Sequence, residues 1–289
     1  MGIKMEWYVL ALISAVIVSI IPIIRKKVLV HEHASEFTTT VYLTMAVLFI
    51  PLLPSLDYSM NATTFFLLLL KGMLLTIASL LFIKAARHME ISAIEPLRNL
   101  SVVFVLVLGY FTLGEIVSLQ QGIGLILIVA GAYALEVHKH KITYSIPSKK
   151  FVWFILFNLV LVSIMAIMDK VLVKRTDIYT IVIIPALIMA IVMFFYQSLK
   201  YKGFEDILHA IRTGRWNMVV LPVLTVIADA TYLMALAIPG ALVALVIALR
   251  RTSTLLSSII GGEIFHDHFL LQKFISSLVM LAGVYIILF

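Results

Sequence analysis

The sequence predicts an all-helical integral membrane protein with ten transmembrane helices, arranged as two inverted five-helix repeats. Of its 289 residues, 63% are hydrophobic and 13% are charged, and the mean hydropathy is +1.13. Soluble domains carry about 25% charged residues, so this composition excludes that class. The apolar residues fall into runs close to the roughly 20 residues that a helix needs to cross a bilayer. The pattern of polar residues also repeats once along the chain.

Two apolar stretches carry the same polar and small residues 152 positions apart, with Leu97-Arg98 matching Leu249-Arg250 and Ala130-Gly131-Ala132-Tyr133 matching Ala282-Gly283-Val284-Tyr285. A shorter echo, Lys-Val-Leu-Val at 27–30 and at 170–173, has a spacing of 143. The second half therefore holds 152 − 143 = 9 additional residues. Since five is odd, the second repeat enters the bilayer from the opposite side, and such inverted repeats hold a substrate site near the midplane.

In the first repeat, residues 1–136, we expect helices at about 7–24, 37–54, 65–83, 91–113 and 118–135. The first run is longer than the core of a signal peptide and lacks a cleavage site before Arg25, so we interpret it as a spanning helix anchored by Trp7 and Tyr8. The basic segment 137–150 is the only strong internal boundary, and we interpret it as a linker.

In the second repeat, residues 151–289, we expect helices at about 151–168, 178–197, 217–236, 240–260 and 269–289. The polar connection 198–216 is the simplest place for the additional residues. It carries four basic residues, and its apolar residues fall at helical spacing: Phe204, Ile207, Leu208 and Ile211. This pattern predicts a short amphipathic helix on the membrane surface.

Several function classes have no support in the sequence. The chain has no cysteine, which excludes disulfides and thiol chemistry. Its net charge of +7 is spread over many short loops, which argues against nucleic-acid binding. The triplets His31-Glu32-His33 and His266-Asp267-His268 do not have the spacing of a zinc site, so we expect no metal. With no nucleophile constellation either, we expect neither an enzyme nor a cofactor.

The first candidate site lies in the predicted helix 91–113. Glu95 and Arg98 are three residues apart and share a helix face, with Pro96 loosening the hydrogen bonds between them. Charged residues are costly inside a bilayer, at about 2.5–3.5 kcal/mol each on insertion scales, and usually face a cavity or a partner. Two interpretations stay open: a cavity-lining role in substrate binding, or an ion pair that joins this helix to a neighbour.

The second candidate site lies in the predicted helix 240–260 and the helix before it. Arg250 heads a polar stripe made by Thr254, Ser257 and Ser258. Arg251 points about 100° away on an ideal helix. Its expected partner is Asp229, which shares a helix face with Tyr232. We therefore predict that substrate-binding residues come from both halves: Glu95, Arg98, Asp229, Tyr232, Arg250 and Arg251.

The charges in these helices suggest a substrate class. Three arginines face two carboxylates, and the surplus favours a substrate with a carboxylate or phosphate, which arginine binds with two parallel hydrogen bonds. Alternatively, a carboxylate is protonated during part of the cycle, which makes Glu95 and Asp229 candidates for proton coupling.

Short motifs in the first half resemble the drug/metabolite transporter superfamily, in its ten-helix EamA-like branch. They are Leu113-Gly114-Glu115 and the segment from Gly122-x-Gly124 to Ala130-Gly131, with a weaker copy at Asp267 and Ala282-Gly283-Val284. The resemblance implies a secondary transporter or exporter of small metabolites, with a central cavity lined by helices from both halves. It also implies that both termini lie inside the cell. The positive-inside rule favours the opposite orientation, because only Lys4, Lys71, Lys170, Lys174 and Arg175 are assigned to the side of the termini.

We therefore predict a secondary-active transporter in the cell membrane that moves a small polar metabolite by alternating access. Amino acids, other organic anions and zwitterions fit the charges, and the predicted partners are this substrate, membrane lipid and, as a candidate coupling ion, protons. Two alternatives remain: a flippase of a lipid-linked phosphate or sugar, and a membrane subunit that transports nothing. The sequence leaves open a monomer or a homodimer.

Overall fold

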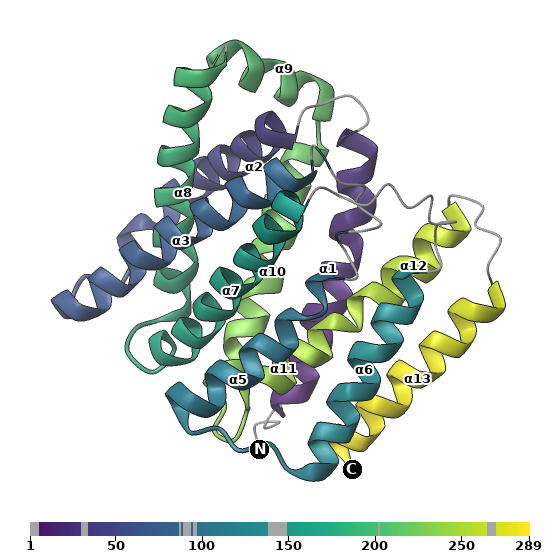
Figure 1. Ribbon diagram of the computed structural model, residues 1–289. Coiled ribbons are helices and arrows are strands. Elements are labelled where there is room, and N and C mark those ends of the chain that lie inside the picture. Colours follow the sequence, from purple (N-terminus) through teal and green to yellow (C-terminus); the bar gives the residue numbers. More distant parts are fainter. Residues whose placement is uncertain are drawn as a thin grey trace.

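The computed structural model describes residues 6–29, 34–86, 88, 94, 97–137, 149–201, 203–264 and 270–289, and within them every regular element is a helix. Figure 1 shows the helices packed side by side, with the start of α1 and the end of α13 at the same end of the bundle. The helices of the first half are α1 (Trp7–Leu29), α2 (Ala34–Phe49), the 3₁₀ helix η1 (Ile50–Ser55), α3 (Ala62–Ala86), α5 (Ser101–Leu113) and α6 (Leu119–Val137). Those of the second half are α7 (Lys149–Leu172), α8 (Ile178–Lys200), α9 (Phe204–Gly214), α10 (Asn217–Ala237), α11 (Val243–Arg251), α12 (Ser253–Ile264) and α13 (Leu270–Leu288).

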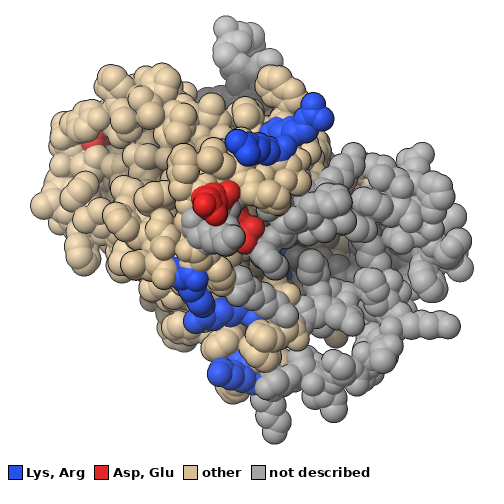
Figure 2. Space-filling view, turned by 90° about the horizontal axis from the view of Figure 1, so that it is seen from above, with Lys and Arg blue, Asp and Glu red and all other residues tan. Residues whose placement is uncertain are grey.

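Many of these helices suit a bilayer. Among the described residues, six helices are long and apolar enough to cross a membrane, namely α1, α2 with η1, α3, α7, α8 and α10. Shorter apolar helices are α5, α6 and α13. On the face shown in Figure 2, wide areas of the coloured surface carry no Lys, Arg, Asp or Glu. The predicted class, an all-helical multi-pass membrane protein, is confirmed.

The continuous helix predicted at 240–260 is wrong, because the chain breaks between α11 and α12 at Thr252. The Thr252 N–H donates to the Leu249 carbonyl at 3.0 Å, and the Leu255 N–H to the Thr252 carbonyl at 3.1 Å. These three-residue hydrogen bonds tighten the turn. In the first half, the Leu100 N–H donates to the Leu97 carbonyl and the Val103 N–H to the Leu100 carbonyl, both at 3.0 Å, where α5 begins. The two turns correspond under the 152-residue repeat.

Helix packing follows the same repeat. The sequence matches α1 with α7, α2 with α8, α3 with α10, α5 with α12, and α6 with α13. The contacts of α1 with α10 then correspond to those of α7 with α3, and the contacts of α3 with α8 to those of α10 with α2. The α2–α8 pair and the α6–α13 pair each consist of two matched helices, so each pair is unchanged when the halves are exchanged. Pairs of helix contacts thus correspond between the two halves of the chain.

In the α6–α13 contact, matched residues of the two halves lie against each other. A Cβ atom on Gly124 would lie 2.7 Å from the Gly283 carbonyl oxygen, and one on Gly131 would lie 2.9 Å from the Ser276 carbonyl oxygen. Under the repeat, Gly124 corresponds to Ser276 and Gly131 to Gly283. Small residues at these positions let the two backbones approach closely, as is typical of helix pairs in membranes.

The predicted amphipathic helix is α9. Its inner face packs Ile207 and Ala210, which are fully or nearly buried, and Ala210 joins a cluster with side chains of α2 and α10. Phe204 and Ile211 point outward and are 65% and 43% exposed. The helix therefore covers the ends of α2 and α10 and also presents an apolar outer face.

The first turn of α8 depends on an N-cap. The Asp177 carboxylate accepts hydrogen bonds from the Thr180 N–H at 2.9 Å and from the Thr180 hydroxyl at 2.6 Å. We expect Asp177→Ala to reduce the free energy of unfolding by about 1 kcal/mol, since it leaves an N–H of the first turn unpaired. Asp177→Asn keeps a capping oxygen and is the control. Denaturant unfolding of both variants in the same detergent measures the difference, and an equal loss in the two would contradict the capping role.

Candidate functional site

A cavity of about 350 Å³ lies inside the bundle, between the two halves of the chain. Its lining residues come from α1, α2, α3, α5 and the turn before α5 in the first half, and from α7, α8, α10, α11 and α12 in the second. Most of its wall is aliphatic, and the ionisable side chains gather in the remaining part. They are Tyr42, Lys71, Arg98, Asp169, Asp229, Tyr232, Arg250 and Arg251.

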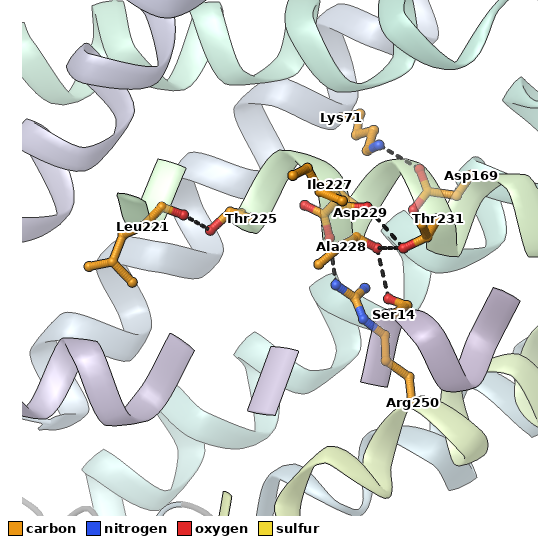
Figure 3. Close-up of polar contacts among 10 residues, drawn as sticks. All are labelled: Ser14, Lys71, Asp169, Leu221, Thr225, Ile227, Ala228, Asp229, Thr231 and Arg250. Carbon is orange, nitrogen blue, oxygen red and sulfur yellow. Dashed lines mark hydrogen bonds and ion pairs between the residues drawn. The ribbon is translucent and has the colours of Figure 1, made fainter. Parts of the chain in front are cut away.

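Arg250 and Asp229 form an ion pair across α11 and α10, with a guanidinium nitrogen 2.6 Å from a carboxylate oxygen (Figure 3). The guanidinium also lies over the Tyr232 ring, 4.8 Å from its centroid. The pairing predicted between Asp229 and Arg251 is therefore wrong. Arg251, one position further round α11, donates instead to the Ser101 hydroxyl at the start of α5, at 2.6 Å. The two adjacent arginines thus connect α11 to both halves of the chain.

Lys71 and Asp169 form a second ion pair in the cavity, which the sequence did not indicate. Their charged atoms are 2.5 Å apart, and the side chains are only 13% and 11% exposed (Figure 3). Lys71 was counted with the basic residues on the side of the termini, but it lies within α3 and reaches α7. Its ammonium also donates to the Ile181 carbonyl of α8 at 3.3 Å. Pro185, four residues on, has no N–H to donate to that carbonyl, so the lysine supplies a donor that the helix cannot.

The predicted residues of the first half are only partly described. Arg98 lines the cavity and lies over the Phe82 ring, 5.6 Å from its centroid. Glu95 and Pro96 lie outside the described residues, and so does the predicted Glu95–Arg98 contact. Five of the six predicted site residues, all but Glu95, therefore lie at one cavity.

The polar stripe predicted after Arg250 has a local role in the structure. The Thr254 hydroxyl donates to the Arg251 carbonyl at 2.8 Å, and the Ser257 hydroxyl to the Thr254 carbonyl at 3.1 Å. Both bonds stay within the chain near the break at Thr252. It is Ser253, the first residue of α12, that lines the cavity.

A second charged cluster lies at the end of the bundle where α10 connects to α11, and we call it the α10–α11 clamp: Glu115, Lys170, and the backbone of 236–243. The Lys170 ammonium donates to the carbonyls of Leu236 and Ala241, both at 2.7 Å. The Glu115 carboxylate accepts the Val243 N–H at the start of α11, at 2.9 Å. A cation thus sits at the end of one helix and an anion at the start of the next, as the helix dipoles favour. Burial raises the pKa of the Glu115 carboxyl, which lies between α5 and α6.

The ionisable groups of the cavity carry a basic surplus. Four described lining residues are cations and two are carboxylates, which gives 4 − 2 = +2 formal charges with Glu95 left out of the sum. Arg98 and Arg251 have further contacts of their own. Within the described residues, no group of His, Cys, Asp and Glu is arranged to hold a metal ion. Both His-acid-His triplets lie outside those residues.

Residues 5–136 match the family described as the EamA-like transporter family. This part of the chain is therefore similar to the domain of that family. The predicted resemblance to the drug/metabolite transporter superfamily is thereby confirmed, and this family suggests a membrane transporter of small molecules. A solved crystal structure shares its fold, with a TM-score of 0.77 and 11% sequence identity over 97% of this chain and 95% of that chain. Comparison with curated proteins gives no match.

Proposed function

We propose that this EamA-like chain is a secondary-active transporter of a small polar metabolite that carries a carboxylate or phosphate group, such as an amino acid or another organic anion. The observation that carries the proposal is the cavity between the two halves, whose described lining residues include four cations and two carboxylates. Guanidinium groups bind carboxylates and phosphates through pairs of parallel hydrogen bonds, so the lining chemistry favours this substrate class.

The proposed architecture is ten transmembrane helices in two inverted five-helix repeats, with α9 as an additional helix between the second and third spans of the second repeat. The exchange of helix contacts and the two equivalent turns support it. Both turns interrupt a helix beside a cavity-lining arginine, Arg98 in one half and Arg250 in the other. Interrupted helices at the midplane are a common way for transporters to build a substrate site. Rocking of one repeat against the other would then expose this site to each side of the cell membrane in turn.

Arg98 and Arg251 are the residues we propose for binding the acidic group. They approach the cavity from different halves, so a bound anion would hold the halves together in one conformation. Arg250 has a different expected role, because its ion pair with Asp229 and its contact with Tyr232 fix the end of α11 beside α10. Removing Arg250 would leave a carboxylate without its partner, which makes Arg98 and Arg251 the better test positions.

Thermal stabilisation of the purified protein by small anions tests this function. We expect a carboxylate or phosphate metabolite to stabilise the wild type, by about 2.7 kcal/mol at one hundred times its Kd. Arg251→Met should lose this stabilisation, while Arg212→Met on the exposed side of α9 should keep it and serves as the control. Uptake of the stabilising compound into proteoliposomes would show that it is transported as well as bound.

Three outcomes would contradict the proposal. Equal stabilisation of Arg251→Met and wild type would place the anion outside the cavity. Stabilisation only by lipid-linked phosphates would favour the flippase alternative. If no anion stabilises the wild type while every arginine variant is simply less stable, the charges have a structural role, as in a subunit that transports nothing.

A further inference from the structure

The Lys71–Asp169 pair differs from the other ion pair of the cavity in its surroundings. Its side chains are 13% and 11% exposed, whereas Arg250 and Asp229 are 25% and 41% exposed. Both members of the Lys71–Asp169 pair line the cavity, so each can meet a bound molecule. The pair also joins α3 of the first half to α7 of the second. It is therefore an interaction between the two repeats that lies inside the substrate cavity.

Lys71 has a second anchor that does not depend on Asp169. Its ammonium donates to the Ile181 carbonyl at 3.3 Å, and Pro185 leaves that carbonyl without its usual helical donor. The Ile181 contact would hold the ammonium in the cavity when its ion pair with Asp169 is broken. An ammonium carries three N–H donors, so it can keep one bond to the carbonyl while exchanging a carboxylate for another anion.

Asp169 is surrounded by charges from several helices. Lys71 comes from α3, Asp229 and Tyr232 from α10, and Arg250 from α11, and the charges of Asp229 and Arg250 are close enough to act on Asp169. Ser101 of α5, Arg98 of the turn before it and Arg251 of α11 line the same cavity. Arg250 and Asp229 neutralise each other, so Lys71 is the main counter-charge of Asp169. An incoming anion would compete with Asp169 for that ammonium.

From this geometry we propose that Lys71 and Asp169 form a proton-exchange pair, in which protonation of Asp169 releases Lys71 to bind the acidic group of the substrate together with Arg98 and Arg251. In the empty site the carboxylate of Asp169 holds the ammonium. A proton from solvent binds a carboxylate oxygen of Asp169, the ion pair is lost, and the substrate anion takes the place of the carboxylate on Lys71. One proton and one negative charge load together, so a monoanion enters with no net change of charge. The inference deepens the proposed function and rests on it, and it makes the transporter a proton–anion symporter.

Coupling of this kind has a measurable consequence. Because the loaded site holds one more proton than the empty site, anion affinity must rise as pH falls, by up to tenfold per pH unit over the range in which Asp169 titrates. The probe is inorganic sulfate, whose own charge is constant across that range. Its Kd for the purified full chain is measured by calorimetry in buffers of constant ionic strength.

Three variants separate the roles. Asp169→Asn keeps the shape of the side chain but cannot ionise, so its sulfate affinity should be high and independent of pH. Lys71→Gln should lose sulfate binding at every pH. The double variant Lys71→Gln/Asp169→Asn carries no unpaired charge, so it should fold even if a single variant does not, and it should also bind no sulfate. Asp177→Asn, which keeps the cap of α8 and lies outside the cavity lining, is the control, and it should keep the pH dependence of the wild type.

The outcomes distinguish this inference from the proposed function. If sulfate binds the wild type with the same affinity at every pH, or if Asp169→Asn keeps the wild-type pH dependence, the proton-exchange pair is wrong and the anion site stands. If sulfate binds the double variant as it binds the wild type, Lys71 is not part of the anion site. If neither sulfate nor any metabolite anion binds the wild type at any pH, the proposed function fails and this inference with it.

Discussion

Gly124→Leu is expected to disrupt the packing of α6 on α13 and to prevent stable folding. Any Cβ atom at this position would lie 2.7 Å from the Gly283 carbonyl oxygen and 3.2 Å from the Ile287 backbone nitrogen. Both neighbours are backbone atoms, so no side-chain rotation can relieve the clash, and the helices must move apart. Overpacking in a core typically costs about 1–3 kcal/mol. We expect about 3 kcal/mol or more here, because four side-chain atoms must fit where one does not.

Gly122→Leu is the matched control, two residues earlier on the same helix. A Cβ atom at Gly122 meets nothing within 4 Å, so we expect a folded protein with unchanged or slightly higher stability. The measurements are the yield of monodisperse protein in detergent and the unfolding temperature of each variant. Similar losses at both positions would mean that glycine is needed for helix flexibility and not for the approach of α6 to α13.

The sequence was informative about the helices because apolar run length is a strong signal. The runs predicted at 7–24, 65–83 and 178–197 fall within α1, α3 and α8. The sequence did not predict the break at Thr252, because none of its residues forbids a helix there and the turn depends on tertiary contacts. The prolines at 51 and 54 did carry a local signal, and the chain there forms η1 rather than the end of α2.

The candidate site was predictable where charges stand out in a single helix. Arg98, Arg250, Arg251 and Asp229 were found because each is a charge inside an apolar run, and all four line the cavity. Their pairing was not predictable, since it depends on which faces of α10, α11 and α5 meet. Lys71 also lies inside an apolar run, but it was not predicted as a site residue.

Lys71 falls inside the predicted helix 65–83, but it was counted only as a basic residue on the side of the termini. Its partner, Asp169, is distant in sequence, and only the contact of α3 with α7 brings the two together. Lys170 was counted on the same side, just beyond the predicted helix 151–168, and it lies at the buried end of α7. Without Lys71 and Lys170, fewer basic residues are left on the side of the termini, and the excess of basic residues on the opposite side becomes larger.

Lys170→Met is expected to release the α10–α11 clamp and to reduce the free energy of unfolding by about 3 kcal/mol. The ammonium makes two hydrogen bonds to carbonyls, each at 2.7 Å, and hydrogen bonds of charged groups contribute about 1.5–3 kcal/mol. Methionine fills a similar volume but leaves both carbonyls of the connection without this donor. Lys174→Met, one turn later on an exposed position, is the control and should change stability by less than about 0.5 kcal/mol.

The same substitution should also loosen the connection locally, and this can be measured without global unfolding. Because the chain has no cysteine, Ala241→Cys introduces a single thiol, at a position that is only 1% exposed. With Lys170 present, a water-soluble maleimide should modify this thiol slowly, since reaction requires the connection to open. In the Lys170→Met background we expect modification at least tenfold faster, whereas Lys174→Met should leave the rate unchanged. Equal rates in all three backgrounds would show that Glu115 and the surrounding packing hold the connection closed without the lysine.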